Sequence, residues 1–279
     1  MKKLLNYIVI IAFALVVSMS VSITAFASAV SIDDMKVLLI SKGLPDSYLS
    51  NLTDEHIESL YEDSFIYNIE YEESIAKMNE YSDQDSSDSQ IVPYGHIDES
   101  MFELKTSKTT FTNSNGSVEK VNIVVNYRWI KEPMNTKTDG ISVNWDASVF
   151  TFLAGSFYSY DELLLDGEYL AKINECTVPD LSQQGGIGYS ARIGMYTGTM
   201  SSGWARGTAS FYVIPTNNPI YEKSTSTGAS AMTFNVNYVY DRTPLFGSIS
   251  FSVAGFGVSV NAPVFNDSLS SSINFYYTR

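Results

Sequence analysis

The sequence offers few residues of the kinds that enzymes use as nucleophiles, bases or metal ligands. It has two histidines, His56 and His96, and one cysteine, Cys176. Each histidine has carboxylates nearby, but neither an H-E-x-x-H segment nor a cysteine–histidine cluster with zinc spacing occurs. A serine nucleophile needs a base that is held by a third group, and no G-x-S-x-G segment is present. The sequence therefore predicts no metal site, no cofactor and no catalytic triad.

Paired carboxylates are the remaining enzymatic option. Asp161 and Glu162 are adjacent, and Asp166 and Glu168 follow closely. Glycoside hydrolysis uses two carboxyl groups about 5 to 10 Å apart, a distance that sequence spacing does not establish. We therefore keep a carboxylate-dependent hydrolase as an alternative function, and a non-catalytic protein is favoured.

Aromatic side chains are the most abundant feature with binding chemistry. The chain has 19 tyrosines, 15 phenylalanines and 3 tryptophans, and most of them occur at positions that suit a core. The others are candidates for stacking on sugar rings or for anchoring a partner protein. The predicted ligand-binding residues are Tyr158, Tyr160, Tyr189, Tyr196 and Trp204.

Two stretches with alternating apolar residues indicate the elements that must position these side chains. Apolar residues occupy every second position from Val121 to Trp129 and again from Ile141 to Val149, and Val124 is the one exception to the alternation. A period of two puts successive side chains on opposite sides of a strand. Lys131–Gly140 is rich in turn formers, so we expect the two strands to pair in an antiparallel sheet with one side covered.

From residue 101 to 279 the composition is typical of a β-protein. Val, Ile, Phe, Tyr, Thr, Ser, Asn and Gly dominate, and short strands alternate with turn clusters such as Gln183–Gly186. The irregular spacing favours an antiparallel β-sandwich over a barrel. The predicted strands are Met101–Thr112, Val118–Ile130, Ile141–Leu153, Glu168–Cys176, Gly188–Tyr196, Ala205–Ile214, Ala231–Tyr240, Ser248–Val260 and Ser272–Thr278.

The residues before 101 divide into three segments. Residues 1–27 resemble a signal peptide, with two lysines, an apolar run and an Ala25-Phe26-Ala27 cleavage pattern. Residues 28–82 are predicted to be a small acidic α-helical segment, and residues 83–100 a flexible linker. Residues 28–100 hold 17 acidic and 3 basic residues, and such a field argues against a nucleic-acid partner.

Ser248–Val260 is the most unusual stretch, because it alternates apolar and small polar residues without a charge and changes parity at Ala254-Gly255. The change of parity requires a bulge or a tight turn. A membrane-inserting strand uses this alternation over about 9 to 11 residues, and so does a core strand. A membrane interaction through Ser248–Val260, as in a β-pore-forming or bacteriocin-like toxin, is therefore a second alternative.

The sequence favours a secreted or cell-surface, non-catalytic binding protein of a Gram-positive-type bacterium. The expected partner is a glycan, a cell-wall component or a protein, and no transmembrane helix is expected after signal cleavage. Whether the N-terminal helices are a pro-segment stays open.

Overall fold

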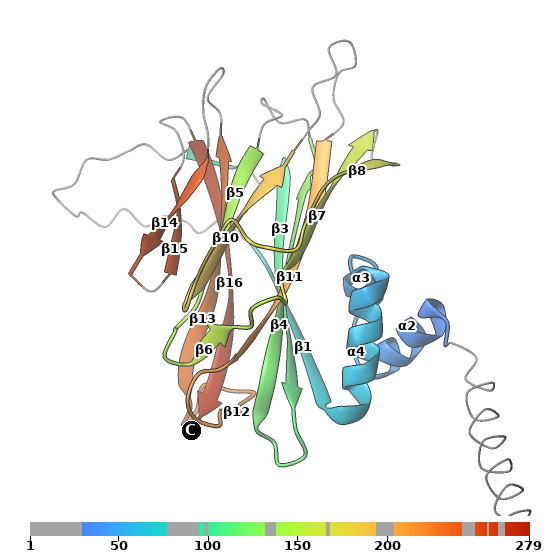
Figure 1. The fold of residues 1–279 in the computed structure, drawn as a ribbon, viewed down its shortest axis with the longest axis vertical. Coiled ribbons are helices and arrows are strands. Elements are labelled where there is room, and N and C mark those ends of the chain that lie inside the picture. The colour runs from blue at the N-terminus through green and yellow to red at the C-terminus, as the bar shows by residue number, and fades with distance from the viewer. Residues whose placement is uncertain are drawn as a thin grey trace, which may run out of the picture.

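The computed structural model describes residues 30–76, 95–97, 100–131, 138–165, 168–193, 204–241, 249–255, 257–261 and 266–279. The predicted signal peptide and nearly all of the predicted linker lie outside these residues, so both stay predictions. Figure 1 shows two layers of strands, with the helices on one side and a short hairpin on the other.

Among the described residues, the helices precede residue 67 and the strands follow them. The helices are α2 (Ile32–Ser41), α3 (Asp46–Leu49) and α4 (Asp54–Ile66). The strands are β1 (Asn68–Ile75), β2 (Gly95–His96), β3 (Phe102–Thr112), β4 (Val118–Trp129), β5 (Thr138–Asn144), β6 (Phe150–Phe152), β7 (Tyr158–Leu165), β8 (Glu168–Cys176), β9 (Leu181–Gln183), β10 (Gly186–Arg192), β11 (Trp204–Pro215), β12 (Tyr221–Glu222), β13 (Ser230–Asp241), β14 (Ser250–Ala254), β15 (Gly257–Asn261) and β16 (Asn266–Thr278).

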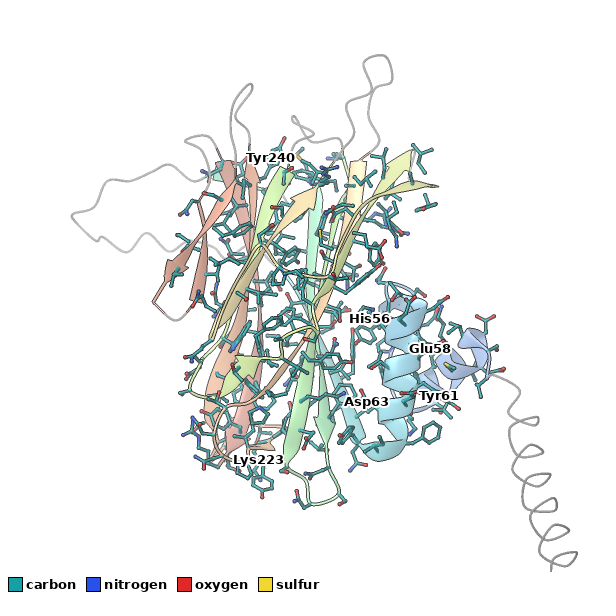
Figure 2. The ribbon with its side chains drawn as sticks, viewed as in Figure 1. His56, Glu58, Tyr61, Asp63, Lys223 and Tyr240 are labelled. Carbon is teal, nitrogen blue, oxygen red and sulfur yellow. The ribbon has the colours of Figure 1, made fainter. Side chains whose placement is uncertain are left out.

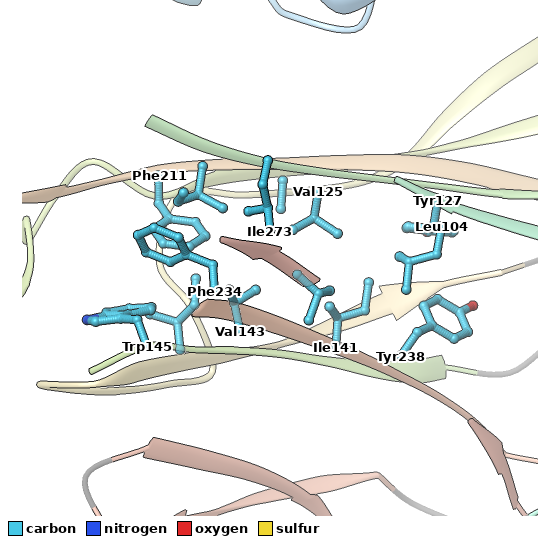
Figure 3. Close-up of a cluster of buried hydrophobic side chains, with 14 of the residues drawn as sticks. Leu104, Val125, Tyr127, Ile141, Val143, Trp145, Phe211, Phe234, Tyr238 and Ile273 are labelled. Atoms are coloured by element: carbon cyan, nitrogen blue, oxygen red, sulfur yellow. The ribbon is translucent and has the colours of Figure 1, made fainter. Parts of the chain in front are cut away.

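In the described part of the chain, two seven-stranded sheets make up the sandwich. Sheet A has the order β1-β3-β4-β11-β7-β8, with β6 beside β11, and sheet B has the order β12-β16-β13-β5-β10-β9, with β2 beside β16. Pairing is antiparallel throughout except between β2 and β16. Side chains from both sheets interdigitate in one core, among them Val125, Val143, Phe234 and Ile273 (Figure 3). The predicted antiparallel, mostly β fold with a small helical segment before it is confirmed.

The predicted pairing of the two alternating stretches is wrong. β4 lies in sheet A between β3 and β11, whereas β5 lies in sheet B between β10 and β13. Their apolar sides face each other across the core, with Val125 on one strand and Val143 on the other (Figure 3). Alternation identifies the buried side of a strand but not its neighbour, because strands that face across a core share the pattern of strands that pair.

The helices cover part of the outer side of sheet A. Ser31 caps α2 by accepting a hydrogen bond from the Asp34 amide at 3.2 Å, and Thr53 caps α4 in the same way. The apolar side of this layer packs on three side chains of the sheet, and the shared cluster is Leu39, Leu44, Tyr48, Leu49, Ile57, Leu60, Phe111, Val124 and Tyr212. The exception to the β4 alternation, Val124, is thus explained by a second buried layer. None of the helices in the described ranges is long and apolar enough to cross a membrane.

A buried ion pair joins the two sheets at one edge of the sandwich. The Lys108 ammonium on β3 lies 2.6 Å from the Glu222 carboxylate on β12 and 3.3 Å from Glu72 on β1. The side chains of Lys108 and Glu222 are 3% and 7% exposed. The ammonium also lies 4.8 Å from the ring centre of Phe275 on β16. Both charges are therefore compensated inside the protein.

Ser248–Val260 forms a separate hairpin. β14 pairs with β15 alone in a two-stranded sheet, and the last pair before the turn is Ala254 with Gly257. Gly255, which begins the turn, has a φ of 62°, a region that glycine adopts at little cost. The predicted tight turn is confirmed, and it keeps the apolar residues of both strands on one side.

Candidate binding surface beside helix α4

Two of the predicted ligand-binding residues lie together on the outer side of sheet A. Tyr158 and Tyr160 are on β7, which pairs with β11 on one side and β8 on the other. Their ring centres are 6.0 Å apart and both side chains are half-buried. Since residues two apart share one side of a strand, the sheet holds the two rings in register.

Helix α4 brings His56 against the first of these tyrosines. The ring centres of His56 and Tyr158 lie 5.1 Å apart, and Figure 2 shows His56 on the side of α4 that faces the sandwich. The Nδ1 atom of His56 is 2.9 Å from the hydroxyl of Thr53, the residue that caps the helix. Burial lowers the pKa of His56, so its imidazole is neutral at pH 7. A neutral ring beside a tyrosine gives this surface a third flat side chain.

Strand β8 supplies two charged groups that hold Tyr158. The hydroxyl of Tyr158 donates a hydrogen bond to Glu175 at 2.6 Å, and Lys172 donates to Tyr158 and to Glu175, each at 3.4 Å. The hydrogen bond from Tyr158, followed by that from Lys172, lowers the pKa of Glu175. Burial, followed by the hydrogen bond to Glu175, raises the pKa of Tyr158. The tyrosine therefore stays a neutral donor and the glutamate stays an acceptor at neutral pH.

Tyr160 links the sheet to the connection between α3 and α4. Its hydroxyl donates to the carbonyl of Asn51 at 2.7 Å, and the Lys172 ammonium lies 5.5 Å from its ring centre. Farther along the same side of sheet A, Arg206 pairs with Glu162 at 2.6 Å. We call His56, Tyr158, Tyr160, Lys172 and Glu175 the α4–β8 surface.

The other three predicted ligand-binding residues do not join this surface. Tyr189 lies in the core, 3% exposed, with its ring 5.3 Å from that of Phe157. Tyr196 lies outside the described residues, and so does the side chain of Trp204, whose backbone begins β11.

The four carboxylates of the hydrolase alternative lie on β7 and β8 or between them. Asp161 points into the sandwich and Glu162 points out, because adjacent residues of a strand face opposite sides. Asp166 and the side chain of Glu168 lie outside the described residues. Asp161 and Glu162 therefore do not form a facing pair across a substrate site.

Asp161 is instead the acceptor of a buried hydrogen-bond network. It accepts from the Tyr127 hydroxyl at 2.6 Å, from the Arg192 amide at 2.8 Å and from the Asn174 side chain at 3.0 Å. Burial raises the pKa of Asp161, although these three hydrogen bonds oppose the shift. The carboxylate is 3% exposed and satisfied by protein donors, which is typical of a structural role.

A second buried carboxylate lies on the facing sheet. Asp139 of β5 accepts a hydrogen bond from the Tyr238 hydroxyl, which in turn accepts one from the Trp129 indole at 3.1 Å. The rings of Tyr238 and Tyr127 are 5.5 Å apart, so each sheet contributes one Asp–Tyr pair to the same end of the core. Within the described residues, no three His, Cys, Asp or Glu side chains are grouped closely enough to hold a metal ion.

Sequence reasoning identified the tyrosines of the α4–β8 surface but not its other three members. His56, Lys172 and Glu175 come from segments that are adjacent only after folding. The N-cap at Thr53 fixed the start of α4, and Lys172 and Glu175 lie within the predicted strand Glu168–Cys176. The strand that carries both tyrosines, β7 (Tyr158–Leu165), falls between the predicted strands Ile141–Leu153 and Glu168–Cys176 and was not predicted.

No model of a known protein family matches this chain. No curated protein is significantly similar to it.

Proposed function

We propose that this protein is an exported, non-catalytic binding protein that contacts a cell-wall or surface glycan through the α4–β8 surface. The observation that carries the proposal is the grouping of two tyrosine rings and a neutral histidine ring with a lysine and a glutamate on the outer side of sheet A. Aromatic rings stack on sugar rings, and charged side chains bind sugar hydroxyls through directed hydrogen bonds.

The rigidity of the surface supports this proposal. Tyr160 is tied to Asn51 and Tyr158 is tied to Glu175, so the rings are already ordered before a ligand arrives. Ordered side chains reduce the entropy that binding must overcome. The same features would suit a protein partner, which is the other expected class of ligand.

Replacing Tyr158 with alanine tests the proposal. A central aromatic contact is worth about 2 kcal/mol, so binding to a glycan on an array or to isolated cell wall should weaken by about thirtyfold. Tyr276→Ala is the matched control, because Tyr276 is also a half-buried tyrosine but lies on β16 of sheet B. Empty glycan arrays together with an empty cell-wall pull-down would refute glycan binding. Retention of a protein in the pull-down, lost in the Tyr158 variant, would move the proposal to a protein partner.

The hydrolase alternative has its own discriminating variant. Glu162→Gln removes the outward carboxylate and its pairing with Arg206 but leaves both tyrosines in place. We expect this variant to bind glycan as the unmodified protein does, and we expect neither protein to hydrolyse it. Hydrolysis of a bound glycan by the unmodified protein, abolished in this variant, would establish the enzymatic alternative.

A second candidate function is membrane contact through the β14–β15 hairpin. One observation favours it: an uncharged two-stranded hairpin lies on the outer side of sheet B and ends in exposed apolar residues, with Val253 54% exposed. Sedimentation of the purified protein with phosphatidylcholine vesicles tests it, and protein that stays in the supernatant at every lipid concentration would exclude it.

A further inference from the structure

We infer that the apolar side of the β14–β15 hairpin is a lipid-binding surface, which the hairpin exposes when it leaves sheet B. The inference rests on the membrane contact proposed as the second candidate function. It adds which side of the hairpin binds lipid and the movement away from sheet B that exposes this side. Figure 1 shows the hairpin on the side of the sandwich opposite the helices.

The two strands form an amphipathic hairpin. The cross-strand pairs Phe251–Val260 and Val253–Val258 form one side, and Ser250–Asn261 and Ser252–Ser259 form the other. The sequence contains no charged residue from Thr243 to Asn266. One apolar side, one small polar side and no charge is the pattern that strands need in order to enter a bilayer.

The apolar side of the hairpin packs directly on the backbone of sheet B at three glycines, which have no side chains to separate the two layers. Gly140, Gly186 and Gly188, which we call the glycine platform, lie beneath it on β5 and β10. A Cβ atom added to Gly188 would lie 2.4 Å from Cδ1 of Phe251, and one added to Gly140 would lie 2.5 Å from Cγ1 of Val260. Such close approach is available only to glycine. The hairpin thus packs against the sheet with part of its apolar side covered: Val258 is 2% exposed, whereas Val253 beside the turn is 54% exposed.

Few directional bonds hold the stored hairpin. In the described residues, β14 and β15 pair only with each other and belong to neither sheet of the sandwich. The side chain of Asn144 makes two hydrogen bonds to the hairpin backbone: Nδ2 donates to the Val258 carbonyl at 3.1 Å, and the Val258 amide donates to Oδ1 at 2.7 Å. Releasing the hairpin therefore breaks no ladder of the sandwich.

Lipid is the partner that suits this surface. The strands have five residues each, which span about 17 Å, roughly half of a hydrocarbon core of about 30 Å. Because the chain carries a net charge of −14, zwitterionic vesicles should bind better than anionic ones.

Fluorescent labels can report entry of the hairpin into lipid. In a Cys176→Ala background, an environment-sensitive dye is attached to Val253→Cys near the hairpin turn. Val178→Cys, an exposed valine beyond β8, is the matched control position. With phosphatidylcholine vesicles the Val253 label should shift to the blue and be quenched by brominated lipid, and the Val178 label should do neither. No change at Val253 with any vesicle would overturn both the membrane contact and this inference.

A reversible disulfide separates release from contact. A Cβ atom added to Gly257 lies 3.2 Å from Cγ of Asn144, near the spacing of about 3 Å between a disulfide sulfur and the opposite Cβ. In the same background, Asn144→Cys with Gly257→Cys should lock the hairpin when oxidised. Oxidation should lower vesicle binding by about tenfold or more, and reduction should restore it. Equal binding in both states would leave the membrane contact standing and overturn the release.

Gly188→Ala gives a second, independent readout. The added methyl group meets Phe251 and Val258 and should push the hairpin off the platform, so this variant should bind vesicles more tightly than the unmodified protein. Binding that is unchanged or weaker, with the sandwich still folded by circular dichroism, would count against storage on the platform.

Discussion

Removing the side chain of Asn144 should loosen the hairpin without unfolding the sandwich. Asn144→Ala deletes the hydrogen bonds of 3.1 Å and 2.7 Å to the backbone of Val258. Each such bond is worth about 1 kcal/mol net, so the free energy of holding the hairpin should fall by about 2 kcal/mol. That change multiplies the population of the released hairpin by about thirtyfold. Because an isolated two-stranded hairpin is only marginally stable, release should also open its own hydrogen bonds.

Amide hydrogen exchange measures this opening residue by residue. Amides of β14 and β15 should exchange about thirtyfold faster in Asn144→Ala, and amides of β13 should keep their rates, because local and global opening are separate events. Asn237→Ala is the matched control, since Asn237 also lies on a strand of sheet B but binds Ser270 at 3.2 Å. A change below about threefold in the hairpin, or an equal change in β13, would refute the view that Asn144 holds it locally.

Three further outcomes follow from individual contacts, two in the interior and one on the α4–β8 surface. Lys108→Met should lower the free energy of unfolding in urea by about 3 to 5 kcal/mol at pH 7, because it leaves the Glu222 carboxylate buried without its cation. Burial holds the pKa of Glu222 above the ordinary 4.5 despite Lys108, and a carboxyl group with a raised pKa in the folded state costs stability as the pH rises through that pKa. Below that pKa Glu222 is protonated and neutral, so Lys108→Met should lose less stability there than at pH 7. A loss of stability that is independent of pH would contradict this reasoning. Asp161→Ala should cost about 3 kcal/mol or more of stability, because it removes the acceptor of the Tyr127 hydroxyl, the Asn174 side chain and the Arg192 amide. Glycan binding by the folded variant should nevertheless match that of the unmodified protein. In Tyr158→Phe, loss of the hydroxyl bonded to Glu175 should weaken glycan binding less than loss of the whole ring in Tyr158→Ala, and equal effects would mean that stacking contributes nothing.

The sequence revealed which sides of the strands are buried more reliably than which strands are neighbours. Alternation in β4 and β5 correctly placed their apolar side chains in a core, because a strand with one buried side has an apolar residue at every second position. The choice of neighbouring strand produces no comparable sequence pattern, and the two strands belong to different sheets. Val124 breaks the alternation of β4 because the helices form a second apolar layer on the outer side of sheet A, and only the folded structure shows that layer.

The sequence predicted only some residues of the candidate surface, for a related reason. Tyr158 and Tyr160 could be selected by residue type, but the same reasoning also selected Tyr189, which the sandwich buries beside Phe157. His56 and Lys172 are more than 100 positions apart in sequence, and only the docking of α4 beside β8 brings both to the same tyrosine ring. A binding surface assembled from distant segments needs the tertiary contacts before its members can be named.

The glycines beneath the hairpin likewise have a role that only the tertiary structure shows. Gly140 and Gly186 are the last residues of the predicted turns Lys131–Gly140 and Gln183–Gly186, where turn formation alone accounts for a glycine. Gly188 begins a predicted strand, where a glycine weakens the sheet. In the folded protein all three glycines allow the hairpin to approach the sheet, because a side chain at any of them would collide with the hairpin or with the Asn144 amide that holds it. A sheet that only had to be stable would carry β-branched residues there. Three glycines under one uncharged hairpin therefore indicate that this side of the sandwich is shaped for close packing of that hairpin, from which the proposed release would have to start.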